Sequence, residues 1–149
     1  NPFQLVVMTS IIASDGKMIE PTIIKGNRVN FKTNEKYFKE IKIIKKAMFK
    51  VVNENKGTAF KSRLEDIKFA GKTGTSQVRR ISLSERESDD FREKEQEWKN
   101  RDHALFVGYM PYDDPKYSIS VIIEHGGSGA STAAPIAKQI FNYINELEV

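Results

Sequence analysis

The sequence contains no cysteine, which excludes disulfide bonds, thiolate metal ligands and a cysteine nucleophile. It has only two histidines, too few to suggest a metal centre, so we expect neither a metal ion nor a cofactor. No apolar run approaches the roughly 20 residues that a helix needs to cross a bilayer. These absences exclude thiol chemistry and a membrane span within the sequence.

The composition is that of one folded domain. Of 149 residues, 39% are apolar and 10% are aromatic, enough for a hydrophobic core. Residues 1–72 hold 15 basic and 7 acidic side chains, whereas residues 73–149 hold 9 and 13. A basic half can bind nucleic acid, but these lysines alternate with core-type residues and no recognition motif accompanies them. We therefore interpret them as a solvated helix face and expect no nucleic-acid partner.

The first residues predict a capped helix that ends at residues 15–16. Asn1 can cap it, Pro2 suits the first helical position, and Gln4 completes a capping box. The helix is apolar almost all round, so we expect it to be buried on most sides, with some of its neighbours encoded upstream.

The remaining pattern predicts strands and two further helices. A charged stretch, 79–102, carries 7 basic and 8 acidic residues out of 24 and is expected to be a mobile excursion. The other expected elements are a strand at 18–24 broken by Pro21, a polar stretch at 25–36, a helix at 35–55, strands at 67–78, 104–110 and 117–124, and a closing helix capped by Ser131 or Thr132. We expect an α+β fold in which helices pack on an antiparallel sheet.

One short segment has residue types that suit ligand binding. It consists of Lys72, Thr73, Gly74 and Thr75, which lie inside a predicted strand. Strand geometry places the two threonines on one face. Two hydroxyl donors beside a fixed positive charge are suited to bind a carboxylate. A glycine within a strand often marks the close approach of a ligand or another backbone. The alternative to a ligand-binding site is a purely structural strand with a bulge and a surface lysine.

Two other motif matches are weaker. The phosphate-binding loop requires a glycine where this sequence has Asp66, and its lysine should open a helix. Ser14 and Lys17 match S-x-x-K, but Gly16 ends the helix between them, so the hydroxyl and the amine do not share a helix face. We therefore expect neither a nucleotide site nor a serine nucleophile there. A lone histidine beside a strand is more often a structural hydrogen-bonding group than a base or a ligand, and we assign no role to His103 or His125.

The segment K-T-G after a strand resembles one of the three signatures of penicillin-binding proteins and serine β-lactamases. Its surroundings strengthen the resemblance: NPFQLVVMTSIIASDGKMIEPTII, FAGKTGTSQV and RDHALFVGYMPYDDPKYSISVIIEHGGSGASTAAPIAKQI are similar to the corresponding segments of class B penicillin-binding proteins, and most of all to the elongation-specific group. The resemblance is weakest at 25–66 and in the charged stretch. It implies that residues 1–149 form the C-terminal part of a transpeptidase domain.

The resemblance also implies roles for individual residues. Lys72 would supply positive charge and join the proton network, and Thr73 and Thr75 would bind the carboxylate of D-Ala-D-Ala or of a β-lactam. The backbone N–H of Thr75 would donate to the oxyanion hole, and Gly74 would leave room for the ligand. Lys72 and Thr75 are thus the expected catalytic residues, and Thr73, Gly74 and Thr75 the expected substrate-binding residues.

Two signatures of the family are missing from this sequence. No serine opens a helical S-x-x-K, and no S-x-N occurs. We therefore expect the nucleophile to lie upstream and the chain to be inactive alone. The alternative is a non-catalytic module that keeps the fold and acts by binding; the presence of S-x-x-K and S-x-N in the natural gene product would distinguish the enzyme from the module. The resemblance further implies a periplasmic domain of an inner-membrane-anchored protein, with stem peptides, β-lactam antibiotics and membrane proteins of the elongation machinery as partners.

Overall fold

The computed structural model describes residues 1–24, 31–33, 35–79 and 97–148. Its elements in chain order are α1 (Pro2–Ala13), β1 (Lys17–Ile19), β2 (Phe31–Thr33), α2 (Phe38–Asn53), β3 (Ala70–Ser76), β4 (His103–Met110), β5 (Tyr117–Ile123) and α5 (Ala134–Glu148). Four short helical turns accompany them, at Glu35–Tyr37, Phe60–Ser62, Trp98–Asn100 and Gly129–Ala133. The charged stretch expected at 79–102 falls largely on 80–96, outside the described residues.

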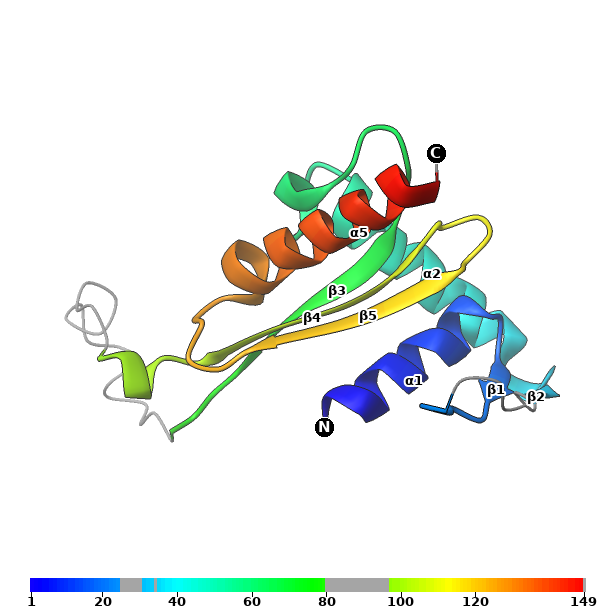
Figure 1. Ribbon diagram of the computed structural model, residues 1–149, viewed down its shortest axis with the longest axis horizontal. Helices are drawn as coiled ribbons and strands as arrows, with labels where there is room; N and C mark the ends of the chain where they lie inside the picture. Colours follow the sequence, from blue (N-terminus) through cyan, green and yellow to red (C-terminus); the bar gives the residue numbers. More distant parts are fainter. Residues whose placement is uncertain (25–30, 34, 80–96, 149) are drawn as a thin grey trace.

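The central feature is an antiparallel sheet with the strand order β3-β4-β5. Residues 71, 73 and 75 of β3 pair with residues 108, 106 and 104 of β4. β1 and β2 form a separate two-stranded sheet. Figure 1 shows the three long strands with α5 on one side and α1 and α2 on the other. The expected α+β class and the antiparallel set of strands are confirmed.

The sheet buries a different cluster on each face. On the α5 face, Phe106 of β4 packs with Phe69, whose ring centroid lies 5.2 Å from that of Phe141 of α5. On the opposite face, Ala13 of α1, Met48 of α2 and residues 70 and 109 of the sheet form a smaller cluster. The larger core therefore lies between the sheet and α5.

The predicted capping box of α1 is present. The Asn1 side chain accepts a hydrogen bond from the Gln4 backbone N–H at 3.0 Å, and the Gln4 side chain accepts one from the Asn1 nitrogen at 3.3 Å. The helix ends at Ala13, and Asp15 and Gly16 follow with φ of 57° and 88°. The predicted turn is therefore confirmed.

Within the described residues α1 is only partly buried, and the expectation that further neighbours cover it stays a prediction. Only Thr9 and Ala13 are buried, and Phe3 and Met8 are 50% and 45% exposed. The reason is geometric: the apolar residues of α1 point in several directions, and those along the apolar cavity that α1 shares with Pro21 and α2 stay partly exposed.

Three local predictions need correction. The strand expected at 18–24 is Lys17–Ile19 and ends before Pro21, where the missing N–H would break a ladder. The polar stretch expected at 25–36 contains β2, which pairs with β1. The last helical segment is capped not by Ser131 or Thr132 but by Ser128, whose hydroxyl accepts from the Ala130 N–H at 3.2 Å and opens a π-turn before α5.

Candidate functional site

The K-T-G segment lies on a strand at the edge of the sheet. β3 runs from Ala70 to Ser76, inside the predicted range 67–78, and among the described residues it pairs with β4 alone. Half of the backbone N–H and C=O groups of such a strand face away from the sheet. The segment is therefore a strand, as the sequence predicted, and the structure adds that one of its sides is open among the described residues.

Alternation along β3 sends its side chains to two faces. Phe69 packs in the α5-side cluster, and a Cβ on Gly71 would lie 2.1 Å from the Phe106 ring, so the odd-numbered residues face α5. Ala70 packs with the α1 and α2 cluster on the other face. Because successive side chains alternate, Thr73 and Thr75 share the α5 side and Lys72 starts from the opposite one.

The lysine side chain nevertheless returns to the threonine segment. Lys72 is exposed, and its ammonium donates a hydrogen bond to the backbone carbonyl of Thr73, with 2.6 Å between Nζ and O. The positive charge therefore lies against the peptide unit that joins Thr73 to Gly74. This contact brings together a lysine and a threonine that strict alternation separates.

The two threonines differ in their partners. The hydroxyl oxygens of Thr73 and Thr58 lie 2.8 Å apart and share a hydrogen bond. Thr58 belongs to the loop after α2 and carried no signal in the sequence. Thr75 is exposed, and its hydroxyl has no hydrogen-bond partner in the part of the chain that the structure describes. One hydroxyl is thus held by the fold and the other is free to turn.

The glycine of the motif lies close to a second glycine. A Cβ on Gly129, in the turn before α5, would lie 2.3 Å from the Gly74 carbonyl oxygen and 2.4 Å from that of Leu105. Only glycine allows the turn to approach the sheet so closely. A Cβ on Gly74 itself would meet only the Leu105 Cβ, at 3.3 Å, so this close approach explains the glycine at 129 and not the one at 74.

The S-x-x-K match at residue 14 is not a nucleophile site in the structure. Ser14 caps the C-terminus of α1, where its hydroxyl donates to the Ser10 carbonyl at 2.7 Å. Lys17 already belongs to β1. The two residues therefore lie on different elements, and the predicted end of the helix between them is confirmed.

The two histidines act as hydrogen-bonding groups. The backbone N–H of His125 donates to His103 Nδ1 at 2.9 Å, and His125 Nδ1 lies 3.0 Å from the Arg101 carbonyl. His125 also contacts the ring of Trp98, with centroids 4.5 Å apart. This cluster joins the start of β4 to the turn after β5. The sequence assigned neither histidine a role; in the structure both take part in hydrogen bonds, and the Trp98 ring contacts that of His125.

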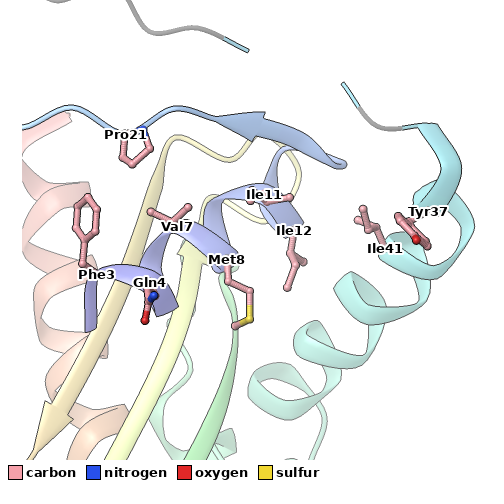
Figure 2. Close-up of a pocket in the computed structure, with 9 residues that line it drawn as sticks. All are labelled: Phe3, Gln4, Val7, Met8, Ile11, Ile12, Pro21, Tyr37 and Ile41. Carbon is pink, nitrogen blue, oxygen red and sulfur yellow. The ribbon is translucent and has the colours of Figure 1, made fainter. Parts of the chain in front are cut away.

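A large apolar cavity lies elsewhere, on the outer side of α1. Figure 2 shows it between α1, Pro21 and the start of α2. Its volume is about 580 Å³. Its lining residues are Phe3, Gln4, Val7, Met8, Ile11, Ile12, Pro21, Tyr37 and Ile41. None of the K-T-G residues contributes to it.

Within the described ranges, no cluster of three or more metal-ligating side chains occurs. No described helix is both long and apolar enough to cross a membrane.

A comparison with protein families gives the decisive observation. Residues 1–142 match the model of the penicillin binding protein transpeptidase domain. The chain belongs to this transpeptidase family. The family resemblance noted in the sequence is thereby confirmed for nearly the whole chain.

Individual relatives agree on the subgroup, penicillin-binding protein 2. The chain is 33% identical to peptidoglycan D,D-transpeptidase MrdA of Haemophilus influenzae, over 95% of this chain and 23% of that protein. Penicillin-binding protein 2 of Helicobacter pylori, solved in complex with MreC, matches with a TM-score of 0.77 and 30% identity over 99% of this chain and 25% of that one. Penicillin-binding protein 2 of Pseudomonas aeruginosa, solved in complex with WCK 5153, matches with a TM-score of 0.64 and 26% identity over 95% of this chain and 29% of that one.

These matches describe a part of a penicillin-binding protein 2 transpeptidase domain. The chain spans about a quarter of the length of the curated relatives it matches.

Proposed function

We propose that this chain supplies the ligand-binding strand of a peptidoglycan D,D-transpeptidase. The observation that carries the proposal is the arrangement on β3: an edge strand in a transpeptidase-family fold presents two threonine hydroxyls, and a lysine ammonium lies against the peptide unit between them. A carboxylate is the ligand that two neutral donors and one positive charge suit best. The substrate group would be the terminal carboxylate of D-Ala-D-Ala, or that of a β-lactam.

Each residue has a distinct role in this proposal. Thr73 and Thr75 donate hydrogen bonds to the carboxylate, and Lys72 supplies its charge and joins the proton network. The backbone N–H of Thr75 serves as an oxyanion-hole donor, which stabilises the negative charge that develops on the carbonyl oxygen during acyl transfer. Gly74, which has no side chain, leaves room for the ligand at the strand edge.

The proposal predicts that ligand capture depends on these side chains. In the natural gene product that carries this sequence, we expect Thr73→Val and Lys72→Met each to lower the rate constant for acylation by benzylpenicillin about 10- to 100-fold, since each removes a hydrogen bond or charge offered to an ionised group. Ser76→Ala, on the same strand beyond the motif, is the matched control and should keep the wild-type rate. Unchanged acylation of both Thr73→Val and Lys72→Met would contradict the carboxylate site.

We also propose that the nucleophilic serine is not supplied by this chain. In the described helices no serine and lysine stand in an S-x-x-K pair, and Ser14 is already engaged as a helix cap. The 149-residue chain should therefore remain unlabelled by a fluorescent penicillin that labels the natural gene product. Stoichiometric labelling of the isolated chain would refute this part of the proposal.

Location and partners follow from the relatives. We propose a periplasmic domain of an inner-membrane-anchored protein that works with membrane proteins of the elongation machinery. The support is the solved complex between Helicobacter pylori penicillin-binding protein 2 and MreC. Cell fractionation of the natural gene product tests the location, and co-purification with its cognate MreC-like protein tests the partner.

A further inference from the structure

We propose that Thr58 is a positioning residue that orients the hydroxyl of Thr73 toward a bound carboxylate. The inference rests on the proposed function, because it assigns to Thr58 a task that exists only if Thr73 binds the ligand. It begins from the 2.8 Å hydrogen bond between the two hydroxyl oxygens. Thr58 is separated from Thr73 by 15 residues and comes from a different element, the loop after α2.

The direction of this hydrogen bond follows from the single hydrogen that the Thr73 hydroxyl can donate. A threonine hydroxyl has one hydrogen to donate and two lone pairs to accept with. If Thr73 donates its hydrogen to a carboxylate, it can only accept from Thr58. Thr58 must then be the donor, which gives a chain from Thr58 through Thr73 to the anion. Such chains strengthen each member, because every donor is polarised by the bond it accepts.

The loop that carries Thr58 is fixed on both sides. The Gly57 N–H donates to the Glu54 carbonyl at 2.8 Å, and the Ala59 N–H donates to the Val51 carbonyl at 3.0 Å. Ala59 is 1% exposed in the α5-side core. A Cβ on Gly57 would lie 2.2 Å from the Val51 carbonyl oxygen, so this loop packs on the end of α2 as closely as a glycine permits. The backbone therefore holds the Thr58 hydroxyl at one place beside β3.

The end of α2 is in turn attached to the start of β3. The Asn53 side-chain amide donates to the carbonyls of Phe49 in α2 and Phe69 just before β3, both at 2.9 Å. The distance between the Thr58 loop and the K-T-G strand is thus set by a second, independent contact. Thr75 has no comparable partner in the described part of the chain, so Thr73 is the hydroxyl that the fold orients before a ligand arrives.

Two substitutions separate the hydroxyl from the shape of the side chain. Thr58→Val keeps the branched shape and removes the hydroxyl, whereas Thr58→Ser keeps the hydroxyl and removes the methyl group. In the natural gene product, we expect Thr58→Val to slow acylation by benzylpenicillin roughly three- to tenfold, the effect of one hydrogen bond. Thr58→Ser should restore the rate to near that of the wild type. If Thr58→Val does not fold, Thr58→Ala removes the same hydroxyl.

A purely structural role of Thr58 would affect ligands with and without a carboxylate equally. The test is therefore whether the effect of the substitution depends on the ligand's carboxylate. The same rates are measured with the methyl ester of benzylpenicillin, in which the carboxylate is neutralised. Thr58→Val should leave the rate with the ester within about twofold of the wild type. In the Thr73→Val background, the Thr58 substitution should have no further effect on either ligand, because the chain through Thr73 is already broken.

The outcomes distinguish this inference from the proposed function. If Thr73→Val slows acylation but Thr58→Val does not, or slows both ligands equally, the positioning role is overturned and the carboxylate site stands. If Thr73→Val has no effect, the carboxylate role of Thr73 and the inference about Thr58 are both overturned. A carboxylate-dependent loss in Thr58→Val that Thr58→Ser restores supports both.

Discussion

The two faces of the sheet are covered by helices that differ both in their apolar pattern and in their packing. α5 has 15 residues and α1 has 12. Phe141 and three alanines near the start of α5 are completely buried, at 0% exposure. In α1, by contrast, Phe3 and Met8 are about half exposed and an apolar cavity lies along the helix.

The difference shows that an apolar sequence sets how much surface a helix can bury, whereas the neighbours that it finds in the fold decide how much it does bury. α5 carries one apolar stripe and places it on a sheet that matches it. α1 is apolar on several sides, and along the cavity its Phe3 and Met8 stay about half exposed. Side chains that a neighbour covers stabilise the fold in proportion to the area removed from water. Substitutions on the two helices should therefore have very different effects.

The largest effect is expected from Phe141→Ala in α5. The Phe141 ring packs against Phe69 in the main core, so its removal loses transfer free energy and leaves a cavity. We expect the free energy of unfolding to fall by about 3–5 kcal/mol, measured by urea denaturation of the 149-residue chain. Phe3→Ala, the matched change in α1, should cost about 1 kcal/mol. Equal losses for the two variants would remove the contrast between the faces.

A smaller loss is expected from Gly129→Ala, on the same side as α5. The new Cβ would lie within 2.4 Å of two carbonyl oxygens of β3 and β4, and a backbone contact cannot yield without moving the strands. We expect a loss of about 1–3 kcal/mol, and slower acylation by benzylpenicillin in the natural gene product, because β3 shifts. Gly127→Ala is a useful comparison: its Cβ would meet nothing within 4 Å, although its φ of 79° adds backbone strain. A variant at residue 129 with wild-type stability would show that the turn is not held against the sheet.

On the α1 side, Lys45 provides the sharpest test. Its ammonium donates to the Ala13 carbonyl at 2.9 Å and to Asp15 at 2.8 Å, which connects the end of α1 to α2. We expect Lys45→Met to lower the free energy of unfolding by about 1–2 kcal/mol. Lys50→Met, which removes an exposed pair with Glu54, should change it by less than about 0.5 kcal/mol. If both variants behave alike, the lysine contact does not hold α1 in place.

The smallest effect at neutral pH is expected from Tyr109→Phe. Tyr109 is completely buried and its hydroxyl has no partner among the described residues, so we expect a change within about 1 kcal/mol. Burial, followed by the nearby Tyr112, Asp15 and Asp113, raises the pKa of Tyr109 above its usual value.

The raised pKa gives the prediction a pH dependence. Above about pH 10 the unfolded chain loses the tyrosine proton and the folded chain keeps it. The unfolded state then binds fewer protons, so the wild type should lose stability as the pH rises from 9 to 11. Tyr109→Phe should lose less stability over the same pH range. The free energy of unfolding is measured by urea denaturation at each pH, and an identical pH dependence for the two proteins would contradict the raised pKa of Tyr109.

Local signals predicted most of the elements. The capping box of Asn1 and Gln4, the turn at residues 15–16 and the strand that carries K-T-G each depend on residues close in sequence, and each is present. The errors lie where distant contacts decide. β2 forms because it pairs with β1, which lies earlier in the chain. The Thr132 hydroxyl donates to the Gly126 carbonyl, and Ser128 caps the last helical segment in its place.

The sequence by itself determined that residues 72–75 form a strand bearing a lysine and two hydroxyls, because alternation and the turn residues around it are local properties. Only the tertiary structure decided that this strand lies at the edge of the sheet, that Gly129 lies against Gly74, and that Thr58 meets Thr73. Those contacts join segments that are 15 to 55 residues apart, and packing in three dimensions, which no local pattern encodes, sets them.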